Sequence, residues 1–508
     1  MATINELYRV DHWAYRAEGN ANLVLQYIGP DPRFSSTVLR LRKIDRPISN
    51  LAGSNGCTDQ RISPIAQQAV ETKSKKKNDL SEEIVFITNI IAPLLGKEFV
   101  EQPNAVALPA EFLLALTVAV EPSRPKHRLQ KIIDCSQAVG FLSLDHTRFL
   151  QPSTNQPSIS IEIKPKWGFL TKSAFIRKEH EIKKRKCRFC MYQHRKMKTG
   201  IETSLSEYCP IDLFSGEEHL VQDAIDSLVK TPQNNLRLFV DGTQRTITGE
   251  SIAQSLSGLS NQDCQRTDSL TGDKKSLQTP QPSQKPLLTD VLTQILIKSP
   301  LLRRLGRLQQ AMDSLDVETI HRFYVQLADP ATTVLPEPTL DECLNTAEAF
   351  LDRTKMDIMM NEDQDTFEGH NAVSLGFGPD DALDEIPDSL KLHFIREFLL
   401  SATLKDCSIL ITIRRCDKAD ELSKEDTNKD LSKIARVHEN AEALVLVFNE
   451  VSHRIKVNNE YFRYKITCID LGPKKMSSVP TYLRKDHDIV SYYLSTVGDR
   501  EPSCGLRR

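Results

Sequence analysis

The sequence predicts an α+β protein with two lobes, and three observations support this prediction. Runs rich in β-branched and other apolar residues lie near both ends of the chain, in 21–44 and in 406–472. Stretches between these runs repeat apolar residues every three or four positions, which is typical of helices. The chain has 508 residues, enough for two lobes with substantial cores, and it contains no evident internal repeat.

The composition is that of a globular protein, with 39% hydrophobic and 26% charged residues. The net charge is only −2, so an anion site has to come from a local group of cations. The N-terminus lacks a basic start followed by an apolar run, and the most apolar window, 105–120, is interrupted by Pro109 and Glu111. We therefore expect an intracellular protein without a membrane anchor, whose eleven cysteines are reduced thiols.

The N-terminal lobe is predicted to span 1–146. It opens with a hairpin, in which the turn GPDPRFSS separates the strands ANLVLQYI and STVLRLRKI. A polar segment, 47–79, is predicted to be a flexible loop. A helix follows from Ser81, which has two glutamates in its first turn, and the run AVGFLSL predicts a further strand.

The C-terminal lobe is predicted to span 147–508. Its helical pattern covers 289–327, and its last strands are predicted at 406–413, 443–451 and 462–472. Three polar or acidic stretches predict flexible insertions, at 243–286, 361–386 and 417–432.

A glycine turn lies in EGNANLVL, residues 18–25. Gly19 and Asn20 tolerate a positive φ, so a tight turn here could present backbone N–H groups to an anion. Arg40 and Lys43 on the following strand could reach the phosphates of a nucleotide. The alternative is an ordinary turn between two strands.

Two aspartates lie at the ends of apolar strands. Asp470 follows the run ITCI and precedes Gly472, a common way to present a carboxylate to Mg²⁺. Asp406 begins the run DCSILIT. Together they suggest a phosphoryl-transfer site in which one carboxylate binds metal and the other accepts a hydroxyl proton. The alternative for each is a carboxylate that caps a turn.

The stretch IEIKPKWGF, residues 161–169, alternates apolar and charged side chains. In a strand, Glu162, Lys164 and Lys166 would share one face and Ile161 and Ile163 the other. The later run RKEHEIKKRKCRFCMYQHRKMK adds many more bases than acids. Such cations suit a cleft for a small, highly charged anion. The alternative is a solvated basic helix or a nuclear-import signal.

A cysteine pair in the same run has spacing that a zinc site could use. Cys187, Cys190 and His194 lie within eight residues, and Cys209 follows. This pattern suggests, as an alternative function, a zinc-containing nucleic-acid-binding module. Against it, no second pair of Cys or His residues closes the site at the usual spacing.

Six motifs together resemble the inositol-pentakisphosphate 2-kinase family. In chain order they are EIKPKWGF, CRFCMYQ, YCPIDLFSG, PQNNLRLFV, ATLKDCSILIT and CIDLGPK. The resemblance implies a two-lobe, protein-kinase-like fold, with an N-terminal antiparallel-sheet lobe and a larger α/β C-terminal lobe that carries insertions. It also implies transfer of the γ-phosphate of ATP, with Mg²⁺, to the 2-hydroxyl of inositol 1,3,4,5,6-pentakisphosphate, which gives inositol hexakisphosphate (phytic acid).

The resemblance also assigns site residues. Asp406 would orient or deprotonate the hydroxyl, Asp470 would bind Mg²⁺, and Arg124 or Arg128 would reach the substrate from the N-terminal lobe. The nucleotide would be bound by Gly19, Asn20, Ala21, Asn22, Arg40, Asp145, His146 and Glu162. The inositide would be bound by Lys164, Lys166, Arg188, Lys196, Asn234, Asn235, Arg237, Lys474 and Tyr482.

The chain departs from the family pattern at two positions. Tyr192 stands where relatives often have histidine, and Ser478 where they often have arginine. Losing one charged donor would weaken substrate binding by about 1.5–3 kcal/mol, which keeps a non-catalytic inositide-binding scaffold as an alternative. No ligand set matching the zinc site of plant relatives is evident. We expect a monomer, in the nucleus or cytoplasm, that binds no nucleic acid.

Overall fold

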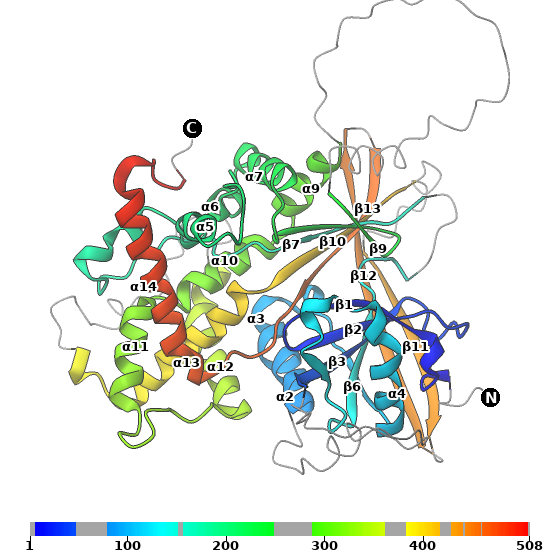
Figure 1. Cartoon of the computed structure of the whole chain (residues 1–508). Helices are drawn as coiled ribbons and strands as arrows, with labels where there is room; N and C mark the ends of the chain where they lie inside the picture. The colour runs from blue at the N-terminus through cyan, green and yellow to red at the C-terminus, as the bar shows by residue number, and fades with distance from the viewer. Residues whose placement is uncertain are drawn as a thin grey trace, which may run out of the picture. The chain divides into compact units, whose positions relative to one another are not determined.

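The structure is a computed structural model (Figure 1). It describes residues 6–46, 79–150, 156–247, 287–360, 383–416, 428–439, 442–458 and 460–505. Within these ranges the chain is a mixture of helices and antiparallel sheets, as the predicted α+β class requires. None of the helices in these ranges is long and apolar enough to cross a membrane.

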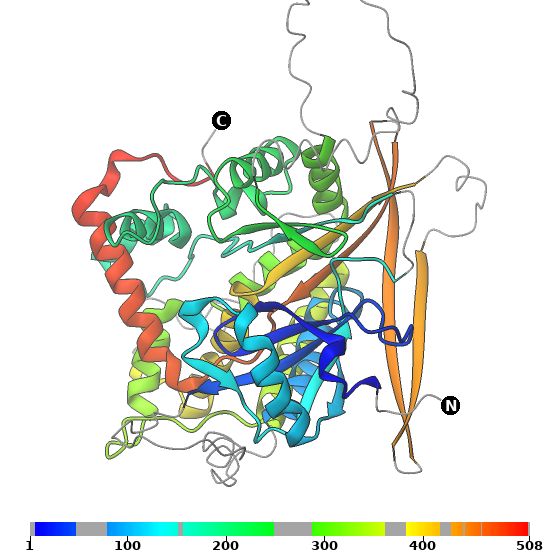
Figure 2. The same cartoon turned by 45° about the vertical axis from the view of Figure 1, so that its right-hand side comes forward.

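The chain divides into two compact units that interleave along the sequence (Figures 1 and 2). Unit 1 comprises Met1–Val85, Glu101–Pro152 and Asn428–Val451. Unit 2 comprises Phe86–Val100, Ser153–Thr427 and Ser452–Arg508. The predicted lobes are single segments that meet at 146/147, and that division stays a prediction.

Unit 1 contains one antiparallel sheet and a helix that packs on it. The predicted hairpin is present, since β2 (Asn22–Tyr27) pairs with β3 (Thr37–Asp45). The sheet has the order β1-β2-β3-β6-β4, with β5 paired to β3. The core joins Leu23, Leu25 and Leu39 of the sheet to Leu113 and Leu116 of α4. The remaining elements are β1 (Trp13–Glu18), α2 (Asp79–Val85), β4 (Asn104–Ala107), α4 (Ala110–Val120), β5 (Lys131–Ile133) and β6 (Val139–Leu144).

Unit 2 is built around strands of a larger antiparallel sheet, whose full order is β11-β12-β13-β10-β7-β8-β9 and whose strand β11 belongs to unit 1. The long strand β12 runs through both units, and its last residues pair with β13. The strands are β7 (Ile159–Ile163), β8 (Leu236–Val240), β9 (Thr243–Arg245), β10 (Ser408–Arg415), β11 (Asn428–Glu439), β12 (Glu442–Val457) and β13 (Glu460–Ile469).

Helices of unit 2 bury the inner strands of this sheet. The strand side chains Ile159, Ile161, Ile409 and Ile411 share one core with apolar residues from several helices. The helices are α3 (Ala92–Leu95), α5 (Arg188–Lys198), α6 (Pro210–Leu213), α7 (Glu218–Lys230), α9 (Leu287–Lys298), α10 (Leu301–Ala311), α11 (Asp316–Leu327), α12 (Leu340–Met360), α13 (Asp388–Lys405) and α14 (Val479–Thr496).

Four strands of unit 2 have ends at one edge of the sheet. Ile163, the last residue of β7, lies opposite Ile409 near the start of β10 and Leu236 at the start of β8. Ile469, the last residue of β13, lies opposite Ser408. Because neighbouring strands are antiparallel, the loops after β7 and β13 and those before β8 and β10 all emerge at this edge.

The predicted flexible segments lie largely outside the described residues. The parts that are described carry secondary structure: 243–245 forms β9, 383–385 forms a turn of 3₁₀ helix, and β11 begins at 428. The predicted helical pattern over 289–327 corresponds to α9, α10 and α11.

Candidate functional site

The edge of the unit 2 sheet gathers residues that are distant in sequence. Lys164 follows β7, Asn235 precedes β8, Asp406 precedes β10, and Asp470 follows β13. The backbone N–H of Lys164 donates to the carbonyl of Asn235, at 2.8 Å, which continues the ladder by one bond. The candidate site therefore depends on strand ends that the fold brings together.

β7 is buried along its whole length, so its faces are not divided into core and solvent. Glu162 is 6% exposed and is fixed by two partners: Ser408 donates to it at 3.0 Å, and Arg237 at 3.3 Å. The predicted alternation holds only through Ile163, because the strand ends there and the two lysines lie in the loop beyond it. A proline at 165 fits that ending, because it lies beyond the last residue of the strand, where no N–H has to be donated to the ladder.

The loop that carries the lysines has a constrained backbone. Lys166 has a φ of +65°, and Gln309 ties down this turn by donating to the carbonyl of Lys166 and accepting from the N–H of Gly168. Tyr208 donates to the carbonyl of Pro165 at 2.8 Å. A left-handed conformation at a lysine is uncommon, and here it is maintained by bonds from two buried side chains.

Lys166 is affected both by burial and by the neighbouring charges. Burial, together with the nearby cations Lys164 and Lys196, lowers the pKa of Lys166 to about 8, against an opposing effect of Asp406. Two ammonium groups kept close together indicate a site whose ligand is anionic, since an anion would relieve their repulsion.

The two aspartates differ in local structure. Asp406 ends α13, and its carboxylate, 65% exposed, accepts from the Lys474 ammonium at 2.5 Å. Asp470 has a φ of +63° and a 55% exposed carboxylate, 3.9 Å from the ammonium of Lys164. Both carboxylates are accessible, as an acceptor of a hydroxyl proton and a ligand of a hard cation have to be, and each also faces a lysine.

Tyr482 lies on α14 and packs edge-on against Phe398 of α13. Burial raises the pKa of Tyr482, and the negative charge of Asp406 raises it further. The phenol therefore stays neutral and can donate a hydrogen bond at this edge.

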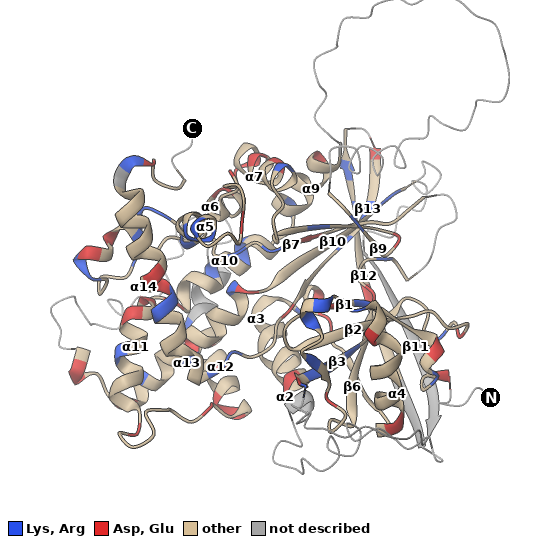
Figure 3. Ribbon diagram, in the orientation of Figure 1, with Lys and Arg blue, Asp and Glu red and all other residues tan. Residues whose placement is uncertain are grey.

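Helix α5 is rich in Lys and Arg, which are coloured blue along its ribbon (Figure 3). Arg188 is held by Asp486 at 3.3 Å, and its guanidinium lies 4.9 Å from the ring of Trp167. Lys196 pairs with Glu202 at 3.3 Å. Tyr192, the departure from the family pattern, has the cationic groups of Arg188, Lys196 and Lys485 within 6 Å of its ring centre. This tyrosine thus contacts cations through its π-face instead of contributing one.

The segment before β8 supplies the last predicted ligands. The side chain of Asn235 is buried and donates to Gln233, and Arg237 donates to the Asn234 amide oxygen at 3.4 Å. Because Arg237 also contacts Glu162, it connects the β7 and β8 ends of the site.

The basic run 177–198 is not a solvated surface throughout. Lys183 is 7% exposed and pairs with Asp316 at 2.5 Å and Asp486 at 2.8 Å. Burial acts to lower the pKa of Lys183, but the carboxylates around it outweigh burial and raise its pKa. Lys186 is also buried and pairs with Glu501. These two lysines of KKRK therefore lie in buried ion pairs, so this part of the run is not a fully solvated basic helix.

Asp486 connects this buried network to the site. It contacts both Lys183 and Arg188, so the orientation of Arg188 depends on a carboxylate from α14. Lys405 plays a similar part, since it pairs with buried Asp313 and lies 4.3 Å from the ring of Trp167. Sequence reasoning missed both residues, because charged side chains on helices are usually solvated.

In unit 1 the turn after β1 is short. The N–H of Gly19 donates to the carbonyl of Asn22, at 2.9 Å, and that of Lys43 donates to the carbonyl of Ala21, at 2.8 Å. Neither Gly19 nor Asn20 is among the described residues with a positive φ, so the turn is tight without using the conformational freedom that these residues allow. A Cβ at Gly19 would meet no heavy atom within 4 Å, which leaves open space beside the turn.

The cations of unit 1 differ in burial and in their partners. Arg124 and Lys43 are buried, and both contact Glu18; Arg124 does so at 2.8 and 3.0 Å. Lys43 is therefore not available to bind a phosphate. Since Arg124 is held by Glu18 in the same way, Arg128 remains as the candidate substrate ligand of the two arginines Arg124 and Arg128. Arg40 lies 3.7 Å from Glu83 and over the ring of Phe141.

The predicted hinge residues follow β6. The Asp145 carboxylate accepts from the N–H of Thr147 and pairs with Arg148 at 3.3 Å, and Arg16 lies 3.8 Å away. His146 lies 2.6 Å from Glu101, which also accepts from the N–H of Leu144. These side chains are thus engaged in hydrogen bonds and ion pairs within unit 1.

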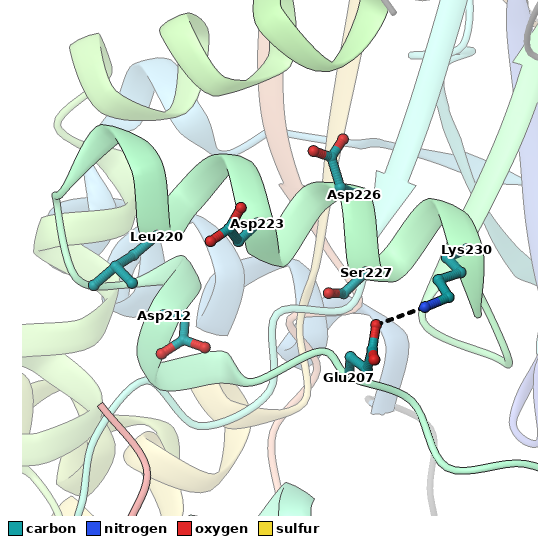
Figure 4. Close-up of a pocket in the computed structure, with 7 residues that line it drawn as sticks. All are labelled: Glu207, Asp212, Leu220, Asp223, Asp226, Ser227 and Lys230. Atoms are coloured by element: carbon teal, nitrogen blue, oxygen red, sulfur yellow. Dashed lines mark hydrogen bonds and ion pairs between the residues drawn. The ribbon is translucent and has the colours of Figure 1, made fainter. Parts of the chain in front are cut away.

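A separate pocket of about 310 Å³ lies against α6 and α7 (Figure 4). Its charged lining consists of four carboxylates and Lys230, whose ammonium pairs with Glu207 at 2.8 Å. An excess of negative charge repels phosphate groups, so this pocket does not suit a polyphosphate ligand. The residues that line it are Glu207, Asp212, Leu220, Asp223, Asp226, Ser227 and Lys230.

Comparisons with known proteins were made for the whole chain. The family model described as inositol-pentakisphosphate 2-kinase matches residues 15–488. The inositol-pentakisphosphate 2-kinase of Arabidopsis thaliana is 29% identical over 500 residues, covering 97% of this chain and 95% of that protein. The inositol-pentakisphosphate 2-kinase of Danio rerio is 25% identical over 551 residues, covering 98% of this chain and 96% of that protein. A protein of the same name from Oryza sativa subsp. indica is 28% identical over 504 residues, covering 97% of each.

Proposed function

The chain belongs to the inositol-pentakisphosphate 2-kinase family, and from this premise we propose that it transfers the γ-phosphoryl group of ATP to the 2-hydroxyl of inositol 1,3,4,5,6-pentakisphosphate. The product is inositol hexakisphosphate. We also propose that the two units correspond to the lobes of a protein-kinase-like fold. ATP and Mg²⁺ are the cofactors of this proposal.

The observation that supports this proposal most directly is the edge of the unit 2 sheet. It combines two accessible carboxylates, Asp406 and Asp470, with the cations Lys164, Lys166 and Lys474. A polyphosphate needs several cationic donors, and phosphoryl transfer needs a carboxylate for the hydroxyl and another for metal. One site that contains both sets fits a kinase acting on a highly phosphorylated small molecule.

Phosphoryl transfer requires little covalent chemistry from the protein, so the residues act by position and charge. Asp406 accepts a hydrogen bond from the 2-hydroxyl and orients it, and Lys474 holds that carboxylate by donating to it. The lysines of the 164–166 loop, with Arg188 and Arg237, bind the substrate phosphates. Tyr482 adds a neutral donor.

The donor set near Asp470 suits Mg²⁺. Its carboxylate is half exposed, lies at a strand end, and supplies the oxygen that hard cations prefer. When bound, Mg²⁺ would neutralise phosphate charge during transfer. Lys164 lies close enough to assist that neutralisation. The turn formed by Gly19, Asn20, Ala21 and Asn22 is proposed to bind the nucleotide through its backbone.

The function is tested with the purified full-length chain, Mg-ATP and inositol 1,3,4,5,6-pentakisphosphate, with products separated by anion-exchange chromatography. A hexakisphosphate product establishes the activity. Tight binding of the pentakisphosphate without turnover would instead establish the scaffold, and neither binding nor turnover would refute the proposal. Family membership does not favour the scaffold or the nucleic-acid-binding alternative.

Lys166 is predicted to make catalysis sensitive to pH. Its pKa of about 8 means that it is charged below that pH and loses its charge as the pH rises through it. Since the charged form binds phosphate, kcat/KM for the pentakisphosphate should fall above about pH 8. Lys166→Ala should raise KM roughly tenfold to a hundredfold, as expected for one lost charged hydrogen bond.

Two variants test this prediction. Lys166→Arg keeps a permanent charge, so its kcat/KM should lack the decline above pH 8. Lys230→Ala, at an exposed ion pair away from the site, should behave like the unchanged protein. An unaltered KM in Lys166→Ala would remove Lys166 from the site, and a decline that persists in Lys166→Arg would assign the titration to another group.

A further inference from the structure

Helices α5 and α14 pack side by side in unit 2 and turn one face each toward the other (Figures 1 and 2). On α5, Arg188, Tyr192 and Lys196 are four residues apart, so they share one face. On α14, Tyr482 and Lys485 are three residues apart and share a face in the same way. The two faces meet, since the ammonium of Lys485 lies 5.1 Å from the centre of the Tyr192 ring.

The Tyr192 ring lies beside the loop that follows β7. The guanidinium of Arg188 lies 5.8 Å from the centre of this ring and 4.9 Å from that of Trp167, the residue after Lys166. Burial lowers the pKa of Lys166, and Lys196 is among the nearby cations that lower it further. The meeting point of the two helices is therefore next to the predicted inositide ligands of α5 and of this loop.

Lys485 differs from the other cations at this ring in having no anionic partner. Arg188 pairs with Asp486, and Lys196 pairs with Glu202. Lys485 is exposed, and none of the carboxylates in the described part of the chain forms an ion pair with it. A cation–π contact at an exposed position is weak and does not replace an anion. The result is an excess of positive charge that an anionic ligand would neutralise.

We propose that Lys485 binds one phosphate of the inositide, as a further substrate ligand on α14 beside Tyr482. Each phosphate of a polyphosphate needs its own cationic donors, and an ammonium group serves as a point charge for one of them. The Tyr192 ring restricts where this ammonium can lie, which lowers the entropy cost of ordering a long exposed side chain on binding. The proposal rests on the proposed function, because it concerns the same substrate.

The test is the affinity of the full-length protein for inositol 1,3,4,5,6-pentakisphosphate, measured by calorimetry without ATP. Lys485→Gln removes the charge and keeps most of the side chain, so binding should weaken about tenfold. The loss should shrink in high salt, since the contact is at an exposed position. Lys485→Arg keeps the charge and should restore most of the affinity.

A matched control lies between the same two helices. Lys198 of α5 is exposed, and its ammonium lies 4.9 Å from the centre of the Tyr492 ring of α14. Tyr492 is about 15 Å farther along the helix than Tyr482, so this pair is remote from the predicted ligands. Lys198→Gln should bind the pentakisphosphate as tightly as the unchanged protein. Equal losses in Lys198→Gln and Lys485→Gln would indicate a general effect of surface charge and overturn the proposal.

Substrates that lack one phosphate locate the contact. The affinities of the unchanged protein and of Lys485→Gln are compared for the inositol tetrakisphosphates that each lack one phosphate of the pentakisphosphate, as in a double-mutant cycle. The tenfold loss should disappear for the compound without the phosphate that Lys485 binds. A loss of the same size for every tetrakisphosphate, or no loss for the pentakisphosphate, would refute the contact.

The binding measurement separates this contact from the proposed kinase activity. An unchanged protein that binds the pentakisphosphate without phosphorylating it would refute the kinase activity, while the loss in Lys485→Gln would still establish the contact. Normal turnover with equal affinity in Lys485→Gln would support the kinase activity and refute the contact. A protein that does not bind the pentakisphosphate would refute both.

Discussion

Replacing Asp406 by asparagine is expected to lower kcat about a hundredfold to ten-thousandfold, the usual contribution of a group that accepts a proton in catalysis. Asparagine has the same shape, and the backbone bond from Asp406 to Thr403 at the end of α13 does not involve the side chain. Since the substituted side chain can no longer accept the proton, KM for either substrate should change much less than kcat. The measurement is steady-state kinetics on both substrates.

A matched control lies on the same helix. Asp388 is in the first turn of α13, with a 78% exposed side chain, so Asp388→Asn makes the same chemical change far from the sheet edge. It should leave kcat unchanged. If Asp406→Asn keeps its turnover, Asp406 has no part in the proton transfer, and the mechanism proposed for this edge fails.

Asp470→Asn is expected to abolish most turnover and to raise the Mg²⁺ concentration needed for the remainder. The amide carries no charge and binds Mg²⁺ more weakly than a carboxylate. Asparagine also tolerates the φ of +63° at this position, so the backbone should remain in place. The rate should be measured across a Mg²⁺ series, together with Mn²⁺ binding in the presence of a non-hydrolysable ATP analogue.

Asp241 provides the control for Asp470. It too has a positive φ, +45°, but it follows β8 at the opposite edge of the same sheet. There its carboxylate accepts from the N–H of Ser158, a bond that an asparagine oxygen can also accept. Asp241→Asn should therefore bind Mn²⁺ and turn over normally. Normal Mn²⁺ binding in Asp470→Asn would show that another group holds the metal.

Much of this fold could be predicted from local pattern. The β2–β3 hairpin, the start of β10 and the end of β13 are marked by apolar runs that stop at turn or charged residues. Asp406 and Asp470 could be singled out for the same reason, since each is the first charge beyond a buried strand. The pattern could not reveal that α13 runs up to Asp406 and that the residue ends this helix.

Other features depended on partners from distant segments. Lys183 and Lys184 are adjacent and chemically identical, yet only the first is buried, because Asp316 lies 133 residues away in sequence and 2.5 Å away in space. The end of the strand at Ile163 could not be predicted either, because Lys164 and Lys166 continue the alternation of apolar and charged residues in the sequence. In the structure, Gln309 and Tyr208 impose a turn there.

The sequence by itself determined the α+β class and the strand-end carboxylates, because these follow from the order of apolar and charged residues along short stretches. Only the tertiary structure decided which cations face the site and which are buried in ion pairs. The tertiary structure also brings Cys504 to Cys187, Cys190 and Cys209, with which it forms a cluster. Cys504 is 317 residues from Cys187 in sequence, so α5, α6 and the C-terminal segment have to pack before these sulfur atoms come together. A thiol cluster assembled from three separate segments has no local signature, because its geometry comes from packing and not from spacing along the chain.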